Sequence, residues 1–516
     1  MVRAFNTTGP CKPDIHYTLS ATARLPNLER LIAQSNYFVF HAPRQTGKST
    51  AMMGLAEQLT EQGNFVAVMV SAEVGAAFPQ DPGSAELAIL GSWRRAARNR
   101  LPVEFHPPSW PDAPPGQRIQ SALEEWARAL PKPLAVFIDE IDSLQDQALV
   151  SVLRQLRDGF PDRPKNFPQS VGLIGLRDVR DYKVAAGGSE RLNTASPFNI
   201  KVRSFTLRNF NAAEVAELYM QHTQETGQIF TPEAVQLAFD LTQGQPWLVN
   251  ALAKEVVEEQ VIDTNVTITF EHIQIAKEIL IRRKDTHLDS LAERLREDRV
   301  RRIIEPMLAG SELSDSASDD IQFLLDLGLC IIAPEGGLTI ANPIYREILP
   351  RVLTVTPMAS MPQISPNWLT VTGELDIDAL KDSFMSFWLQ HGEPLLNSAL
   401  YHEIAPHLVL MAFLHRVING GGTLEREYAI GRDRMDLCLQ YGAVTLGIEI
   451  KVQRDDRRNQ LVRGLEQIDG YLARLGLEFG WLVIFDRRAN VLPIEERLRS
   501  ELHQSVQGRE ITVIFA

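Results

Sequence analysis

The stretch HAPRQTGKST, residues 41–50, decides the fold of the first part of the chain. It follows the apolar run YFVF, residues 37–40, which is predicted to be a strand, and it precedes a predicted helix. The apolar residues of that helix recur at i, i+3, i+4 and i+7, which places them on one face; they are Met52, Leu55, Ala56 and Leu59. A strand, a loop ending in Gly-Lys-Ser and a helix form the context in which backbone N–H groups hold phosphates.

The loop therefore predicts a nucleotide site. Lys48 would neutralise the β- and γ-phosphates of ATP, and the Ser49 hydroxyl would bind Mg²⁺. Ala42 stands where the pattern G-x-x-x-x-G-K-[ST] has its first glycine, and its small side chain is compatible with a closed loop. The loop residues expected to bind ATP are Ala42, Pro43, Arg44, Gln45, Thr46, Gly47, Lys48, Ser49 and Thr50.

An acidic motif follows about 90 residues later. LAVFIDE, residues 134–140, is an apolar run that ends in Asp139 and Glu140. Asp139 would hold Mg²⁺ through water, and Glu140 would polarise the water that attacks ATP. An Asp-Glu pair on its own is more often a helix cap. Because the pair follows a phosphate-binding loop, ATP hydrolysis is the favoured interpretation.

The chain is long enough for several domains, because 516 residues exceed what one hydrophobic core supports. Residues 1–200 alternate apolar strands with amphipathic helices, which predicts a parallel sheet wrapped by helices. Residues 201–280 are expected to be helical throughout, and 285–353 to form helices and then a hairpin. A Pro/Ser-rich linker, 354–366, precedes a separate α/β unit.

The charge, apolar runs and cysteines of the chain argue against several classes of protein. The net charge of −13, from 52 Lys and Arg against 65 Asp and Glu, argues against a general nucleic-acid coat. The sequence has no apolar run of membrane-spanning length, and its first residues lack a signal-peptide layout, so no membrane association is expected. Three widely spaced cysteines fit a reducing compartment, and a cytoplasmic location is expected.

A second candidate site lies near the C-terminus, in LGIEIKV, residues 446–452. A two-residue turn at Gly442 and Ala443 would join this strand to the preceding one. Asp436 and Glu449 each lie six residues from that turn, so a hairpin places them opposite one another. Glu449 and Lys451 share a face of their strand, because side chains alternate.

Opposed carboxylates have Cβ atoms about 5 Å apart and repel each other, and a divalent cation between them removes the repulsion. Oxygen ligands favour Mg²⁺ or Mn²⁺ over Zn²⁺. Lys451 could orient or deprotonate a water and stabilise charge on a phosphate. The opposite face is expected to be a core face; its residues are Leu437, Leu439, Leu446, Ile448 and Ile450.

The first part of the chain resembles AAA+ and STAND-type P-loop ATPases. The resemblance rests on the phosphate loop, the Asp-Glu motif, the helical segment and Gly244-Gln245-Pro246, which in that clade closes a helical lid over the nucleotide. It implies that His16 and Tyr17 lie near the adenine, although a buried structural pair is equally compatible. It also implies a γ-phosphate sensor among Arg177, Asp178 and Arg180, with Arg177 and Arg180 also candidates for an arginine finger, although a surface loop with paired charges is equally compatible. It also implies ATP-dependent homo-oligomers.

The last part resembles the PD-(D/E)xK nucleases, which have a restriction-endonuclease-like α/β fold. Asp436 and Glu449-Ile450-Lys451 match the family's motif, and Glu403, in the preceding helix, would complete the metal shell. Gln467 and Tyr471 match the Q-x-x-x-Y of RecB-type exonucleases and would contact substrate. The domains implied by both resemblances are an ATPase core (1–200), a helical lid (201–284), a winged helix (285–353), a linker (354–366) and a nuclease-like domain (367–516).

Two functions follow from these motifs. One is an ATPase with a Mg²⁺-dependent nucleic-acid-cleaving domain, with DNA as the expected partner, in DNA processing or defence against mobile DNA. The other is a regulatory or signalling ATPase whose nuclease-like domain only binds nucleic acid or a protein. The complete Asp436, Glu449 and Lys451 set favours the first, because a binding domain has no need of opposed carboxylates.

Overall fold

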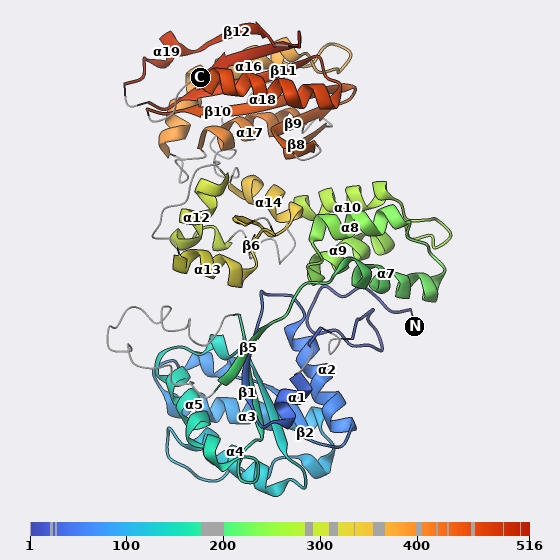
Figure 1. Cartoon of the computed structure of the whole chain (residues 1–516), viewed down its shortest axis with the longest axis vertical. Coiled ribbons are helices and arrows are strands. Elements are labelled where there is room, and N and C mark those ends of the chain that lie inside the picture. Colours follow the sequence, from blue (N-terminus) through green and yellow to red (C-terminus); the bar gives the residue numbers. More distant parts are fainter. Residues whose placement is uncertain are drawn as a thin grey trace. The chain divides into compact units, whose positions relative to one another are not determined.

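The structure is a computed structural model of the chain (Figure 1). The described residues are 2–20, 24–25, 28–176, 201–283, 291, 293–308, 318–334, 336–353, 367–398, 405–418, 422–430, 433–455, 460–488, 490–505 and 507–516. The chain divides into two compact units. The N-terminal unit comprises Met1–His287 and Gln322–Pro343, and the C-terminal unit comprises Leu288–Ile321 and Ile344–Ala516. Within the described residues, no helix is both long and apolar enough to cross a membrane.

The N-terminal unit is built on a five-stranded sheet in the order β2-β3-β4-β1-β5. Its strands are β1 (Tyr37–His41), β2 (Val66–Ser71), β3 (Leu134–Asp139), β4 (Ser170–Gly175) and β5 (Lys201–Thr206). Every pair is parallel, which confirms the predicted parallel sheet. The expectation that residues 201–280 are helical throughout is wrong at its start. The segment KVRSFT contains residues of high β propensity, and it pairs with the edge of β1.

Helices cover both faces of this sheet (Figure 1). Side chains alternate along each strand, so Val39, Val68 and Val136 face one layer, and Phe38, Met69 and Phe137 face the other. The first layer contains α3 (Pro82–Arg100), α4 (Arg118–Ala129) and α5 (Asp146–Asp158). The second contains α1 (Leu28–Ala33) and α2 (Lys48–Glu61).

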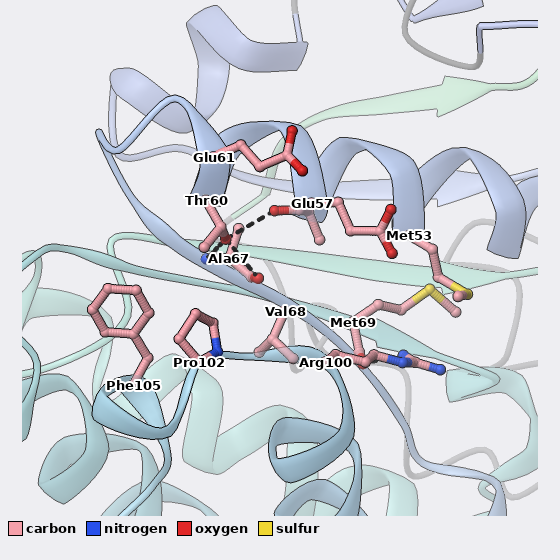
Figure 2. A pocket seen from close by; sticks show the side chains of 11 residues that line it. Met53, Glu57, Thr60, Glu61, Ala67, Val68, Met69, Arg100, Pro102 and Phe105 are labelled. Atoms are coloured by element: carbon pink, nitrogen blue, oxygen red, sulfur yellow. Dashed lines mark hydrogen bonds between the residues drawn. The ribbon is translucent and has the colours of Figure 1, made fainter. Parts of the chain in front are cut away.

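Several outward backbone groups of the edge strand β2 are satisfied by side chains. The Ala67 N–H donates to Thr60 Oγ1 over 3.0 Å (Figure 2), and the Ser71 carbonyl accepts from Trp93 Nε1 over 3.1 Å. Arg100 Nη1 donates to the Met69 carbonyl over 2.6 Å. These contacts protect the edge against pairing with another strand.

Helices follow β5, as predicted for the rest of that segment. They are α7 (Ala212–Thr226), α8 (Pro232–Thr242), α9 (Pro246–Glu255), the π-helical turn Val256–Gln260 and α10 (Phe270–Arg283). Asn211 and Glu214 form a reciprocal capping box at the start of α7, and Thr231 caps α8 ahead of Pro232. Local sequence therefore sets where these helices begin.

A predicted hairpin is confirmed in the next segment, where Cys330 pairs with Ile340 and Ile332 with Leu338. Its strands are β6 (Cys330–Ile332) and β7 (Leu338–Ile340). The flanking helices are α12 (Asp298–Leu308), α13 (Ser318–Leu327) and α14 (Pro343–Leu353).

The C-terminal unit contains a mixed six-stranded sheet in the order β12-β13-β11-β10-β9-β8. The strands are β8 (Gly422–Ile430), β9 (Asp433–Tyr441), β10 (Val444–Gln453), β11 (Phe479–Asp486), β12 (Arg499–Gln504) and β13 (Glu510–Phe515). The strands β10, β11 and β13 are parallel to one another, and the other pairs are antiparallel. The helices are α16 (Ile377–Ser398), α17 (Ala405–Ile418), α18 (Gln460–Leu475) and α19 (Ile494–Arg497).

The two faces of this sheet are covered by different helices. Side chains of α16 and α17 pack with Trp481 and Val483 in one apolar cluster. Side chains of α18 pack with Leu482 and Ile484 in another, and Figure 1 shows α18 lying along β10 and β11. The predicted core face is confirmed, because Leu437, Leu439, Leu446, Ile448 and Ile450 all belong to the first cluster.

Candidate functional site

The phosphate-binding loop lies between β1 and α2, at the carboxyl edge of the parallel sheet. Gly47, directly before the helix, has φ of 87°, a left-handed conformation that glycine adopts without strain. Gln45 has φ of 59°, so the loop makes a second sharp turn. Thr46 Oγ1 donates to the Pro43 carbonyl over 2.9 Å and closes the loop on itself.

Lys48 lies across this loop. Its Nζ donates to the carbonyl oxygens of Ala42 and Pro43 over 2.7 and 2.8 Å. Burial lowers the pKa of Lys48 to about 8, and the Asp139 carboxylate acts in the opposite direction. Nucleotide phosphates would give this ammonium a stronger partner than two neutral carbonyls.

The two predicted ATPase motifs meet at the sheet edge. Ser49 Oγ donates to Asp139 Oδ2 over 2.7 Å. Burial raises the pKa of Asp139, and the hydrogen bond from Ser49 opposes that shift. Asp142, one turn beyond, accepts from the Leu176 N–H at the end of β4 over 3.2 Å, so the ends of three adjacent strands are connected.

Glu140 projects from this edge with its side chain exposed. Its backbone has φ of 55°, and its N–H donates to Asp139 Oδ1 over 3.0 Å. Partial desolvation, and then the nearby carboxylates of Asp139 and Asp142, raise the pKa of Glu140. A carboxylate with a raised pKa is better matched to accepting a proton near neutral pH.

These residues fit a Mg²⁺ site. The Ser49 hydroxyl and the Asp139 carboxylate are both oxygen donors, which Mg²⁺ prefers. The described residues contain no group of three or more His, Cys, Asp or Glu side chains placed to hold a metal ion. Two protein oxygens suffice for Mg²⁺ when nucleotide phosphates and water supply the other ligands.

The Gly244-Gln245-Pro246 element reaches the phosphate loop. Gln245 Nε2 donates to the Gln45 carbonyl over 3.5 Å, and Gln245 Oε1 accepts from the Leu248 N–H and caps α9. Gly244 has φ of 69° and accepts from the Phe210 N–H over 2.9 Å. The helical segment therefore contacts the loop through the residues that the resemblance singled out.

Arg24 is a buried cation beside the loop that sequence reasoning missed. Its Nη1 donates to the Arg208 carbonyl over 3.2 Å, and its guanidinium lies 4.7 Å over the Phe210 ring. A Cβ added to Gly47 would lie 3.5 Å from Nη2. Burial lowers the pKa of Arg24 to about 10, and Nε has no hydrogen-bond partner among the described residues. No motif surrounds this arginine, so only the fold reveals it.

The N-terminal segment, residues 2–20, is fastened to both the loop helix and α7. The Cys11 N–H donates to Thr50 Oγ1 over 3.0 Å. Tyr17 is buried against His222, with 3.2 Å between the hydroxyl and Nδ1. Because the Tyr17 hydroxyl is already paired, the geometry favours the structural alternative for this residue.

The second candidate site lies on the β9–β10 hairpin. The strands pair from Val444 with Tyr441 to Ile448 with Leu437, which confirms the predicted turn and register. The regular pairing ends there, and the predicted opposition of Asp436 and Glu449 lies one step beyond it. There the Asp436 carboxylate takes part in the pairing, because Oδ2 accepts from the Ile450 N–H over 2.8 Å.

Glu449 is 2% exposed. Its Oε1 lies 2.5 Å from Lys451 Nζ, whereas Oε2 has no hydrogen-bond partner among the described residues. Burial, and then the Asp436 charge, raise the pKa of Glu449 to about 8, while Lys451 acts against the shift. A buried carboxylate oxygen without a partner is costly, and a divalent cation would satisfy it. The oxygen donors here fit Mg²⁺ or Mn²⁺.

The helix α18 covers this face of the sheet, where Tyr471 packs against Cys438. Gln467 lies one turn earlier, and its Oε1 is buried without a partner among the described residues. Both residues are therefore on the carboxylate side of the sheet. The other predicted site residues, Glu403, Arg177, Asp178 and Arg180, lie outside the described residues.

A pocket of about 300 Å³ elsewhere on the N-terminal unit lies between α2 and the end of α3 (Figure 2). Met53 and Glu57 line one side, and Pro102 and Phe105 line the other. None of the predicted site residues lines it, so it is separate from both candidate sites.

No model of a protein family matches the sequence, and a search of curated proteins finds no relative. Among solved structures, the chain is similar to the Walker-type ATPase PABY2304 of Pyrococcus abyssi, at 12% identity and a TM-score of 0.47 over 66% of this chain and 98% of that one. It is also similar to the ORC2 protein of Aeropyrum pernix, at 14% identity and a TM-score of 0.39 over 66% and 93%. A third similar structure is the Holliday junction branch migration motor RuvB of Thermotoga maritima. Its identity is 16% and its TM-score 0.34, over 63% of this chain and 92% of that one. All three TM-scores are below 0.5, so these similarities carry no argument about function.

Proposed function

We propose that the N-terminal unit binds ATP with Mg²⁺ and hydrolyses it. The observation that carries this proposal is the hydrogen bond between Ser49 and Asp139 beside the Lys48 ammonium. Bound Mg²⁺ would neutralise charge on the β- and γ-phosphates. Lys48 would exchange its loop carbonyls for phosphate oxygens, and backbone N–H groups of residues 42–50 would hold the same phosphates.

The remaining residues of this site have separate roles in the proposal. Asp139 holds Ser49 in place, and Glu140 accepts a proton from the attacking water. Gln245 connects the lid to the loop, so closure of the lid would respond to the nucleotide. Arg24 is positioned to add a positive charge beside the phosphates. An arginine from another copy, with Arg177 and Arg180 as candidates, would complete the site in an ATP-dependent oligomer.

We also propose that the C-terminal unit hydrolyses phosphodiester bonds of nucleic acid, with DNA as the expected substrate. The observation that carries this is the buried Glu449 carboxylate, with one oxygen on Lys451, one oxygen unpartnered among the described residues, and Asp436 across the hairpin. A bound Mg²⁺ or Mn²⁺ would polarise the phosphate and lower the pKa of a water. Asp436 and Glu449 would hold that ion, with Glu403 as the third carboxylate that the resemblance implies.

Lys451 would stabilise the negative charge that develops on the phosphate. Its ammonium is already within 2.5 Å of Glu449, so the residue is held at the site without substrate. Gln467 and Tyr471, on the same side of the sheet, would contact the substrate backbone. The alternative is a regulatory ATPase whose C-terminal unit binds nucleic acid or a protein without cutting.

The test is cleavage of labelled single- and double-stranded DNA and RNA by the full chain with Mg²⁺ or Mn²⁺, in the presence and absence of ATP. We expect metal-dependent cleavage that is lost in Glu449→Gln, and ATP binding that is lost in Lys48→Ala. Lys165→Ala, an exposed lysine outside the site, is the matched control. Nucleic-acid binding without cleavage under every condition would favour the binding-only alternative.

A further inference from the structure

A pocket of about 350 Å³ lies at the carboxyl ends of β10, β11 and β13 in the C-terminal unit. It is lined by Arg488, Arg497 and Arg499 and by one carboxylate, Asp486. Two more carboxylates, Glu393 and Glu501, contact two of these guanidinium groups, so the charges are balanced, but most of the charged groups that line the pocket itself are guanidinium donors. Such a pocket favours an anionic ligand.

Each guanidinium in the pocket is oriented by one carboxylate. The pairs are Arg488 with Asp486, Arg497 with Glu393 and Arg499 with Glu501, at 2.5, 3.1 and 2.7 Å. A guanidinium has five N–H donors, so one carboxylate leaves others for a ligand. Glu393 and Glu501 do not line the pocket and hold their arginines from outside it.

Arg497 is the buried member of the group, with 9% of the residue exposed. Its Nη1 donates to the Leu492 carbonyl over 2.6 Å. Its Nε has no hydrogen-bond partner among the described residues. A buried charged donor without an acceptor is unfavourable, and this donor belongs to a side chain that lines the pocket.

The helix α18 begins at the same pocket. Gln460 and Leu461, its first two residues, are part of the lining. A helix of 16 residues carries a partial positive charge at this end. The helix and the arginines therefore favour the same kind of ligand, a compact anion such as a phosphate group.

Part of the pocket lining lies on the face of the sheet that carries the candidate nuclease residues. Side chains alternate along a strand, so Gln453 shares a face with Lys451 and Glu449. At about 3.3 Å per residue, Gln453 lies about 13 Å along β10 from Glu449. Successive phosphates of a helical strand lie about 6–7 Å apart, because each step combines a rise of about 3.4 Å with a turn about the axis, so this distance corresponds to about two nucleotides.

We propose that this arginine pocket binds a phosphate group of a nucleic acid. It would so hold the nucleic-acid strand a few nucleotides from the phosphodiester bond that lies at Asp436 and Glu449. The positioning role rests on the proposed nuclease function, whereas phosphate binding itself does not. The phosphate could be a terminal monoester at a strand end or an internal diester of the backbone. Both present the oxygens that arginine forks recognise.

The test measures binding without cleavage, using the full chain with Glu449→Gln as the parent. Labelled oligonucleotides with a 5′-phosphate, a 3′-phosphate or no terminal phosphate are titrated by fluorescence anisotropy. Arg488→Gln combined with Arg499→Gln should weaken binding at least about tenfold and reduce its salt dependence. These side chains are 51% and 53% exposed, so their replacement should spare folding. Arg487→Gln, an exposed neighbour outside the pocket, should stay within about twofold of the parent.

Competition identifies the source of the phosphate. If the protein binds one end-phosphorylated oligonucleotide more tightly than the others, the pocket binds a terminal monoester. If a circular single strand competes as well as a linear one, the pocket binds an internal diester. Binding by the double arginine variant within about twofold of the parent would overturn the proposal, as would a parent that binds no oligonucleotide. Failure of the nuclease proposal is recognised separately, as wild-type protein that binds oligonucleotide through these arginines but never cuts it.

Discussion

The Ser49 hydroxyl donates a hydrogen bond to Asp139 Oδ2 over 2.7 Å, although 90 positions separate the two residues. The parallel sheet brings them together, because β1 and β3 both pair with β4 and end at the same edge. Lys48 begins the helix after the loop that follows β1, and Glu140 directly follows β3, so one edge carries a cation, a hydroxyl and two carboxylates. This convergence is the basis of the first prediction.

Glu140→Gln should bind ATP with an affinity close to that of wild type and hydrolyse it at least about 100-fold more slowly. The amide cannot accept a proton from water, and general-base catalysis contributes about 10²–10⁴-fold. The measurement is nucleotide titration together with phosphate release. Glu73→Gln removes an exposed neighbouring carboxylate and should leave the rate unchanged. Hydrolysis at the wild-type rate by Glu140→Gln would show that another group activates the water.

The loop and the strands around it could be predicted from sequence because both signals are local. A buried parallel strand is a short apolar run, and the Gly-Lys-Ser loop needs particular residues at adjacent positions. Strand β5 was missed because six residues next to a helical segment carry little periodic signal. Arg24 was missed because its importance comes from Gly47 and Phe210, neither of which is near it in sequence.

Gly244→Ala should lower the free energy of unfolding by about 2–5 kcal/mol. A left-handed conformation costs a residue with a Cβ about 1–2 kcal/mol, and overpacking costs about 1–3 kcal/mol. Overpacking applies here because the added Cβ would lie 1.8 Å from the Phe210 carbonyl oxygen, and no side-chain rotation can relieve a contact with backbone.

Gly227→Ala is the matched control for this variant. Gly227 has φ of 81°, and nothing lies within 4 Å of its added Cβ. It should therefore show the conformational cost alone, about 1–2 kcal/mol. Urea unfolding of both variants measures the difference, and equal losses would mean that the segment around Phe210 moves freely.

Acidification should destabilise the N-terminal unit through His222. Burial lowers the pKa of His222 below its ordinary value of 6.5, although its hydrogen bond with Gln228 opposes the shift. As the pH falls below 6.5, the unfolded chain therefore takes up a proton that the folded chain resists. Stability should fall by up to about 1.4 kcal/mol per pH unit for this one proton.

The variant His222→Gln distinguishes the effect of proton uptake on stability from the effect of losing the hydrogen bonds of the imidazole. At about pH 8 the imidazole is neutral in both states, so the variant measures only the changed contacts with Tyr17 and Gln228. Between about pH 8 and pH 5.5 the variant should lose less stability than wild type. An identical pH dependence of the two proteins would assign the acid sensitivity to other groups.

The hairpin register could also be predicted from sequence, because a two-residue turn at Gly442 fixes which residues are opposed. The buried environment of Glu449 could not be predicted from sequence. Its burial depends on α18, which follows in the chain and packs against this face. The arginine pocket could not be predicted either, because its lining comes from the ends of β10, β11 and β13, the starts of α18 and β12, and α19, which are separated in sequence.

The next prediction concerns the carboxylates of the hairpin in metal-free protein. Asp436→Asn should raise the free energy of unfolding by about 0.2–1 kcal/mol, because it removes a like charge across the strands. The Asp436 charge is the second cause, after burial, of the raised pKa of Glu449, so its removal should also lower that pKa. The same variant should bind Mn²⁺ at least about tenfold more weakly and lose cleavage, since it removes an anionic oxygen ligand. Glu478→Gln, an exposed carboxylate of the same unit, is the control.

Lys451→Ala should behave in the opposite way. An ammonium is no metal ligand, and in metal-free protein Lys451 is the partner that neutralises Glu449. Its removal leaves a buried carboxylate without a partner, so the metal-free protein should be less stable, while Mn²⁺ should bind at least as tightly as to wild type. Cleavage should nevertheless be lost, because no group then stabilises charge on the phosphate. Calorimetric titration with Mn²⁺ and urea unfolding with and without a chelator measure these effects. Wild-type protein that binds no divalent ion, or a combined Asp436→Ala and Glu449→Ala variant that still cuts, would contradict the metal-site assignment.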